Sequence, residues 1–335
     1  MKKSLFLPLL LLATTFSFSQ DINKYINAQE AERIEKMLAS DEMRGRKIFS
    51  PELDKAADFI AAEFKTSGLQ TWAQSKSFRQ EFFMIRPKFI SAAATLDGVT
   101  IDPKNVMVIT CQPELKIDQG SGYEIVVAKK DVSLSTQAGA LMKNNKNYLV
   151  LVDTANAAAF PRLSSLKRAI YKTDKSLIFI LGANIPSAYQ IEARHEISED
   201  KLANVVGMIP GKSKKDEYVI FSGHYDHLGV STRPTGTDSI YNGANDDASG
   251  VTAMMMLARY FKALKNNERT LIFVAFTGEE SGGYGARYFS NQFDADKVMA
   301  MFNIEMIGTE SKWGKNSTYI TGFELTDMGP ILQKN

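Results

Sequence analysis

Residues 218–226 read YVIFSGHYD, an apolar run that ends in a histidine and an aspartate. Two further short apolar runs follow downstream, at residues 271–276 and 298–302. Apolar runs of this kind, bounded by helical segments, are typical of strands in a sheet that is covered on both faces. We therefore predict an α/β fold, a three-layer sandwich with a twisted, mostly parallel central sheet.

The predicted helices support this fold class. Apolar residues recur at helical spacing in segments 27–39 and 51–65, and segment 249–264 is apolar nearly all round, which predicts a buried helix. A further helix is predicted at 285–293 and a strand at 78–85.

A change in the pattern of apolar and polar residues marks an inserted region. Residues 95–203 alternate short apolar runs with polar linkers and hold no cluster of catalytic residue types, so we predict an inserted subdomain of mixed strands and helices. The main domain then consists of residues 20–94 and 204–335. The alternative is that the strands of the insert extend the main sheet. Strands are expected at 106–110, 123–128, 148–152 and 177–181, and a helix at 163–171.

The first residues have the features of a secretory signal peptide. Lys2 and Lys3 precede a short apolar run, and small residues stand before residue 20. We predict that residues 1–19 are removed and that the protein is exported to the periplasm or the cell exterior. No membrane span is expected after removal; a retained anchor is the alternative, although the apolar run is too short to cross a bilayer.

Composition excludes several classes of function. The chain has 335 residues, with 40 Lys and Arg against 38 Asp and Glu, so it lacks the basic surplus of a nucleic-acid-binding protein. Its single cysteine, Cys111, rules out an internal disulfide and a multi-thiolate zinc site. The serine-hydrolase elbow, the His-Glu-x-x-His helix and the phosphate-binding loop are absent from the sequence.

Polar residues gather where the predicted strands end. In open α/β sheets, ligands bind beyond the carboxyl ends of the strands. The residues concerned are His224 and Asp226, Glu279 and Glu280, Glu305, and the pair Asp246-Asp247 before the buried helix. Singly, the aspartates could cap the helix, the glutamates could lie in a solvated turn and the histidine could simply end a strand. Together, so many carboxylates would repel one another unless a divalent cation neutralised them, and histidine with carboxylates is a zinc-like ligand set.

Four of these segments resemble, in order, the zinc aminopeptidases of metallopeptidase family twenty-eight. They read SGHYD at 222–226, NDDASG at 245–250, TGEE at 277–280 and NIEMIG at 303–308. The stretch 38–46 and the helix that ends at Gly68 also resemble this family, so the resemblance covers about residues 20–92 and 203–322. The middle region is weakly similar to the protease-associated insert that some members carry.

The resemblance implies a set of metal ligands. His224, Asp246 and Glu305 would bind a first zinc ion, and Asp246 would bridge to a second, which Glu280 would also bind. Glu305 stands where the family has Asp, so its carboxylate is one methylene further from the backbone. The peptide bond from Asp246 to Asp247 is expected to be cis.

The resemblance also implies a mechanism. Two zinc ions per site would lower the pKa of a shared water, and Glu279 would take its proton and return it to the leaving amine. Asp226 would orient the ring of His224. The expected function is that of a secreted zinc aminopeptidase acting on peptides with a free N-terminus. The alternatives are a single-zinc acyltransferase of the glutaminyl-cyclase branch and a non-catalytic binding relative, against which the intact 246–250 motif and Glu279 argue.

One ligand is missing from the pattern. The family binds its second zinc with a histidine well after the last motif, and no histidine follows His227 here. We expect His195, in a polar run, to lie on the surface, and the side chain of His227 to point away from His224; the alternative is that His227 replaces the missing ligand. Residues 318–321 and 325–332 predict the start of another strand and helix. We therefore expect the sequence to be a C-terminally truncated fragment, inactive if its second zinc site stays incomplete.

Overall fold

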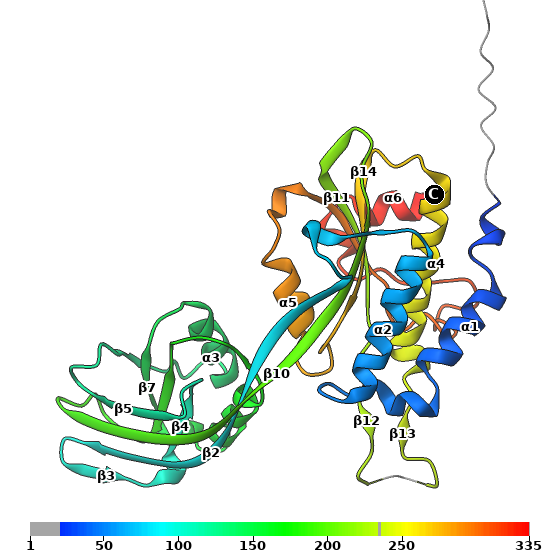
Figure 1. The fold of residues 1–335 in the computed structure, drawn as a ribbon. Helices are drawn as coiled ribbons and strands as arrows, with labels where there is room; N and C mark the ends of the chain where they lie inside the picture. Colours follow the sequence, from blue (N-terminus) through cyan, green and yellow to red (C-terminus); the bar gives the residue numbers. More distant parts are fainter. Residues whose placement is uncertain (1–20, 234–235, 335) are drawn as a thin grey trace, which may run out of the picture. The chain divides into compact units, whose positions relative to one another are not determined.

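The computed structural model describes residues 21–233 and 236–334, so the predicted signal peptide lies outside the described residues. The chain forms two compact units (Figure 1). The first unit consists of the described residues up to Arg79 and those from Asn204 onward, and the second consists of residues 80–203. The first junction lies near the start of one long strand, β2 (Arg79–Leu96), whereas we placed it at residue 94.

Three parallel strands form the centre of the first unit. They are β11 (Lys214–His224), β14 (Arg269–Phe276) and β15 (Val298–Asn303), and β11 lies between the other two. The last residues of β10 (Tyr189–Ile209) pair antiparallel with β14, and β1 (Gln70–Thr71) pairs antiparallel with β10. The sheet is therefore mixed rather than mostly parallel. Only residues 210–213 join β10 to β11, which is too short for the crossover connection that parallel strands need, so β10 runs antiparallel to the three central strands.

Helices pack against both faces of these strands. Phe261 of the buried helix stacks on Phe221 of β11, while Phe289 joins the core cluster of Ile220, the neighbour of Phe221 that points to the opposite face. Ser50 caps the second helix by accepting a hydrogen bond from the backbone N–H of Leu53. The helices of the first unit are α1 (Ala28–Leu38), α2 (Pro51–Thr66), α4 (Ser249–Leu264), α5 (Tyr284–Ser290) and α6 (Met328–Lys334).

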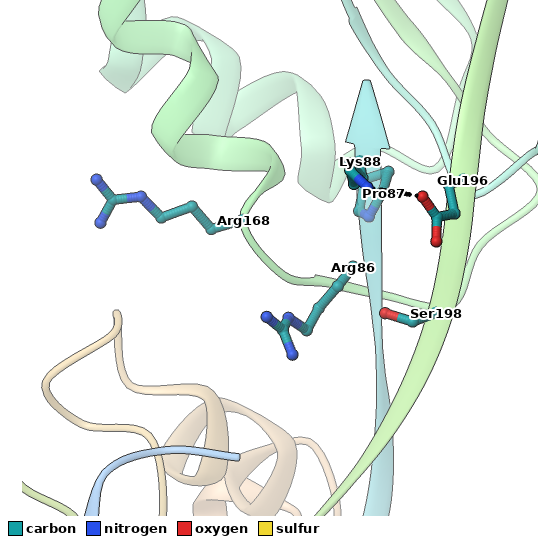
Figure 2. A pocket seen from close by; sticks show the side chains of 6 residues that line it. All are labelled: Arg86, Pro87, Lys88, Arg168, Glu196 and Ser198. Atoms are coloured by element: carbon teal, nitrogen blue, oxygen red, sulfur yellow. Dashed lines mark hydrogen bonds and ion pairs between the residues drawn. The ribbon is translucent and has the colours of Figure 1, made fainter. Parts of the chain in front are cut away.

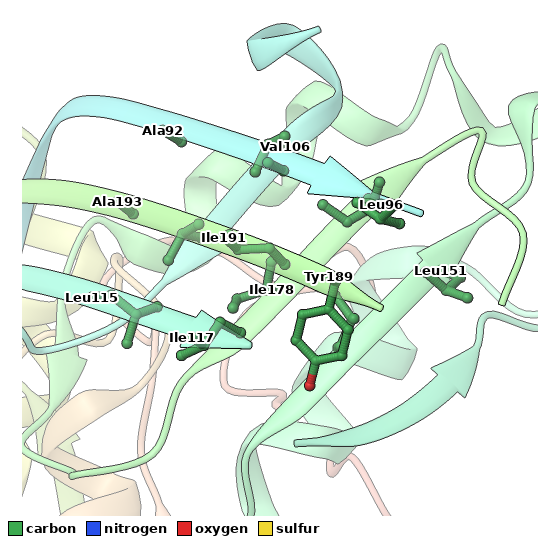
Figure 3. Packing of buried hydrophobic residues seen from close by; sticks show 14 residues of the cluster. Ala92, Leu96, Val106, Leu115, Ile117, Leu151, Ile178, Tyr189, Ile191 and Ala193 are labelled. Atoms are coloured by element: carbon green, nitrogen blue, oxygen red, sulfur yellow. The ribbon is translucent and has the colours of Figure 1, made fainter. Parts of the chain in front are cut away.

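The second unit has its own sheet and core. The elements are β3 (Val99–Ile101), β4 (Val106–Ile109), β5 (Glu114–Asp118), β6 (Glu124–Val127), α3 (Leu134–Lys143), β7 (Tyr148–Val152), β8 (Ile170–Tyr171) and β9 (Leu177–Leu181). Strands β6 and β9 both pair parallel with β7, and β4 pairs antiparallel with β9. Side chains of these strands pack with those of β5 and β10 in an apolar cluster (Figure 3).

Some sequence-based expectations about elements were wrong. Residues 163–171 are not an α-helix: a 3₁₀ segment, Phe160–Lys167, is followed by the short strand β8. Residues 318–321 are not in a strand, and the helix expected from 325 begins at Met328. Within the described residues, no helix is both long and apolar enough to cross a membrane.

Candidate metal centre

The carboxyl ends of the three parallel strands meet at one edge of the sheet. His224, the last residue of β11, is in register with Phe276 at the end of β14, and Ser222 is in register with Asn303 at the end of β15. The backbone N–H of Ile304 donates to the carbonyl of Ser222 at 2.8 Å, which extends this alignment beyond β15. The segments that carry the predicted ligands therefore start from neighbouring points.

The first group of candidate ligands forms around His224. Its Nε2 lies 3.0 Å from Oδ1 of Asp246 and 3.6 Å from Oε1 of Glu305. All three donor atoms lie within 4.8 Å of one another. The imidazole is buried, whereas both carboxylates are partly exposed. The structure thus brings together the three residues that we predicted as ligands of the first metal ion.

The second group contains a histidine that sequence reasoning set aside. Nδ1 of His227 lies 2.8 Å from Oε1 of Glu280, and both atoms lie within 4.8 Å of a carboxylate oxygen of Asp246. Asp246 belongs to both groups, as a bridging ligand would. The only sequence signal for His227 is its position three residues after His224, in the loop beyond the same strand.

The donor atoms of these groups fit a metal ion better than they fit one another. Within the described residues, His224 Nε2, His227 Nδ1 and Asp246 Oδ1 are buried and make no hydrogen bond. The short N···O distances therefore lack hydrogen-bond geometry. Buried polar atoms without partners are costly and rare. Imidazole nitrogens and carboxylate oxygens are zinc ligands, so the chemistry of this donor set suits zinc.

Asp247 ties the ligand-bearing segments together. Its peptide bond with Asp246 is cis, which confirms that expectation. The buried carboxylate accepts hydrogen bonds from the backbone N–H groups of His224 at 3.0 Å, Gly250 at 3.1 Å and Met306 at 3.2 Å. Burial raises the pKa of Asp247 to about 7, against the opposing effect of these bonds. Through these hydrogen bonds the side chain of Asp247 holds the segments that carry the candidate ligands in fixed positions.

Asp226 positions the turn that carries Glu279 and Glu280. Its buried carboxylate accepts from the backbone N–H of Glu279 at 3.0 Å and of Glu280 at 3.3 Å. Nδ1 of His224 lies 3.0 Å from the backbone carbonyl oxygen of Asp226 and 3.7 Å from its carboxylate. Burial lowers the pKa of His224, but the hydrogen bond and charge of Asp226, with the charge of Asp247, outweigh it and raise the pKa to about 10.

Glu279 lies at the rim of the centre, where its side chain is exposed. Partial burial raises the pKa of Glu279 above its ordinary value; the charge of His224 opposes the shift, and the charges of Glu305, Asp226 and Glu280 add to it. A carboxylate with a raised pKa binds a proton more readily, which suits a general base.

No pattern in the sequence indicated that Arg46 helps to hold the loops around the candidate metal centre. Its guanidinium is fully buried and donates to the backbone carbonyls of Tyr225 at 2.7 Å, Asn242 at 2.7 Å and Gly243 at 2.9 Å, and to that of Leu38. Burial lowers the pKa of Arg46 to about 10, although the nearby aspartates oppose the shift. A cation therefore sits under the acidic centre and holds the loops on either side of it.

The expectation that His195 is a surface residue was wrong. Its side chain is 3% exposed, in the second unit, with its ring edge-on to Phe89 at 5.7 Å between centroids. Residues of β10 alternate between buried and exposed, and His195 is in phase with the buried Ile191 and Ala193. The polar neighbours that suggested a surface position point to the other side of the strand.

A cavity in the second unit holds none of the predicted site residues. Its volume is about 320 Å³ (Figure 2), and Lys88 there pairs with Glu196 at 2.9 Å. The lining residues are Arg86, Pro87, Lys88, Arg168, Glu196 and Ser198.

The chain has relatives among zinc peptidases. Residues 204–322 match the family described as Peptidase family M28. A probable zinc metalloprotease of Pyricularia oryzae is 35% identical over 113 residues, which is 33% of this chain and 22% of the relative. One of Pyrenophora teres f. teres is 36% identical over 136 residues, 40% of this chain and 28% of the relative. The matched part thus spans less than a third of either relative.

The fold is also similar to those of two solved aminopeptidase structures. The aminopeptidase from Aneurinibacillus sp. strain AM-1 superposes with a TM-score of 0.45 and 19% identity, covering 86% of this chain and 72% of that one. BSAP, a zinc aminopeptidase from Bacillus subtilis, superposes with a TM-score of 0.43 and 17% identity, covering 84% of this chain and 69% of that one. The segment 204–322, which matches Peptidase family M28, includes every ligand of both candidate groups.

Proposed function

We propose that the protein is an exported zinc-dependent aminopeptidase that removes residues from the N-terminus of peptides. The observation that carries this proposal is the pair of donor groups that share Asp246, with three buried atoms lacking any hydrogen bond within the described residues. The peptidase domain in this proposal is the first unit, and the second unit, residues 80–203, is an insertion.

His224, Asp246 and Glu305 would hold the first zinc ion, and Asp246 and Glu280 would contribute to the second. Zinc bound by these residues would acidify water and polarise the substrate carbonyl. Asp247 keeps the ligand segments in register through its three backbone hydrogen bonds.

Glu279 is the general base of the proposal. Its backbone is fixed by Asp226, while its exposed carboxylate lies at the rim where a substrate would arrive. Glu279 takes a proton from the attacking water, holds it while the tetrahedral species forms, and delivers it to the leaving amine. The raised pKa of Glu279 favours the first half of this transfer, in which the carboxylate takes up the proton.

Peptides with a free N-terminus are the proposed substrates. The exposed carboxylate of Glu279 lies in neither donor group, so zinc bound by those groups does not take up its charge. Such a carboxylate attracts the ammonium group of a peptide N-terminus and disfavours an acidic group. This charge supports the proposal of an exopeptidase that acts at the amino end.

The substitution Glu279→Gln tests the base assignment. It keeps the shape and removes the proton acceptor, so cleavage of a leucyl-anilide should fall by about 10²- to 10⁴-fold while zinc content stays unchanged. Glu268→Gln, an exposed position just before β14, is the matched control and should keep full activity. Near-normal turnover in Glu279→Gln would show that another group is the base.

A second assay separates the proposal from the acyltransferase alternative. The wild-type protein should release the anilide and leave a glutaminyl peptide uncyclised. Cyclisation without anilide cleavage would contradict the proposal, and zinc binding with neither reaction would indicate a binding protein.

A further inference from the structure

The environment of His227 singles it out among the residues that the proposed mechanism leaves without a role. Its side chain is only 10% exposed, and its Nδ1 lies 2.8 Å from Oε1 of Glu280. Nδ1 makes no hydrogen bond within the described residues, so this contact is not an N–H donated to the carboxylate. An oxygen of Asp246 lies within 4.8 Å of both atoms. Three donors thus surround one point without satisfying one another.

The backbone around His227 holds the ring in this orientation. The N–H of His227 donates to the carbonyl of Arg46 at 3.2 Å. Two residues earlier, the N–H of Tyr225 donates to the carbonyl of Phe276 at 2.9 Å. On the far side of the ring, a Cβ added to Gly243 would lie 2.7 Å from Cδ2 of His227. The imidazole packs directly against this glycine, and its Nδ1 edge faces Glu280.

We propose that Nδ1 of His227 is the third protein ligand of the second zinc ion, beside Glu280 and the bridging Asp246. This inference rests on the proposed function, which supplies the zinc. Each ion then has the same donor set of one imidazole and two carboxylates, and Asp246 is common to both. His224 and His227 serve the two ions from opposite ends of a four-residue stretch that begins at the last residue of β11.

A merely structural role would look different. A histidine that only orients Glu280 would donate an N–H to the carboxylate, whereas here the N···O vector lacks that geometry. Removing such a partner would leave the number of bound ions unchanged. Removing a ligand would lose one ion selectively, because the first group keeps its own histidine.

Zinc stoichiometry provides the test. The metal-free protein is titrated with zinc by calorimetry, and bound zinc is counted by mass spectrometry after gel filtration. The wild type should bind two ions, and His227→Gln one, with the second affinity weakened by at least about 100-fold, since even groups outside the ligand shell cost 10- to 100-fold. Glu280→Gln should lose the same ion. His195→Gln, the third histidine and not part of either donor group, should keep both.

The outcomes separate this inference from the proposed function. Two ions in His227→Gln would overturn the role of His227 and leave the peptidase proposal intact, whereas a wild type that binds no zinc would overturn the peptidase proposal itself. Retention of the first ion in the variant serves as the check on folding. If the variant does not fold, X-ray absorption of the zinc-loaded wild type decides: we expect one imidazole per zinc on average, and half that number would exclude His227.

Discussion

At the scale of single residues, buried charge organises the centre. Asp226 and Asp247 point their carboxylates at backbone N–H groups of the ligand segments, and Arg46 points its guanidinium at backbone carbonyls. A buried charge is tolerated when hydrogen bonds replace its water. These three side chains therefore fix the positions of ligands that are themselves close to solvent.

Arg46→Lys tests this role. An ammonium group cannot reach four carbonyls that a planar guanidinium reaches at once, so at least one buried carbonyl loses its partner. We expect the free energy of unfolding, measured by urea denaturation, to fall by about 2–4 kcal/mol. Arg44→Lys, exposed on the same turn, should change it little. Equal stability of the two variants would mean that the buried hydrogen bonds are not needed.

Residues differ in how far the sequence could predict them. Local pattern and topology could place four residues at one edge of the sheet, because they lie at the end of a strand or within four residues after one. These are His224, Glu279, Glu280 and Glu305. The role of Arg46 could not be predicted because three of its four carbonyl acceptors lie 179 or more residues away, at Tyr225 and beyond. Such contacts depend on tertiary packing, which no local pattern reports. The same holds for His227, whose ring orientation depends on Gly243.

At the scale of elements, the burial pattern of a long strand was hard to predict from the sequence. β10 runs from Tyr189 to Ile209 and alternates buried and exposed residues in its first half, where charged residues suggested a polar surface segment. Its second half is buried almost throughout, because it lies inside the sheet of the first unit. A helix capped by local residues, such as α2, was predicted to within a residue, since its signals are local.

We expect His195, in β10, to make the stability of the second unit depend on pH. Burial lowers the pKa of His195, and the charge of Lys167 adds to this, so the folded form resists a proton that the unfolded chain takes up near pH 6.5. The free energy of unfolding of the second unit should therefore fall as the pH drops below about 6.5. His195→Phe cannot bind this proton and should reduce the difference in melting temperature between pH 7.5 and 5.5.

Scanning calorimetry at both pH values measures this effect. Arg194→Gln, on the exposed side of the same strand, should keep the wild-type difference. An unchanged pH dependence in His195→Phe would mean that another group causes the loss of stability in acid.

At the scale of the whole molecule, the fold class could be read from the sequence, but the sheet order could not. The three parallel strands and their helices follow from local patterns, whereas the antiparallel pairing of β10 and β14 joins residues about 70 positions apart, from Val205 to Ala275. Both donor groups lie in the first unit, and the second unit has hydrophobic clusters of its own (Figure 3).

This division predicts how zinc affects unfolding. Zinc at 100 times its dissociation constant should stabilise the first unit by about 2.7 kcal/mol per independent site and leave the second unit unchanged. Calorimetry with excess zinc and with a chelator should therefore show one transition that moves and one that does not. A chelator that shifts only the transition assigned to the second unit would place the metal elsewhere.

We propose that zinc binds between the side chains gathered at the ends of β11, β14 and β15. Anomalous diffraction from crystals of the zinc-loaded protein, recorded on both sides of the zinc absorption edge, locates the bound ions. We predict one peak among His224, Asp246 and Glu305 and a second among His227, Asp246 and Glu280. Fully loaded crystals with no peak at this edge of the sheet, or with zinc only at other positions, would contradict the account.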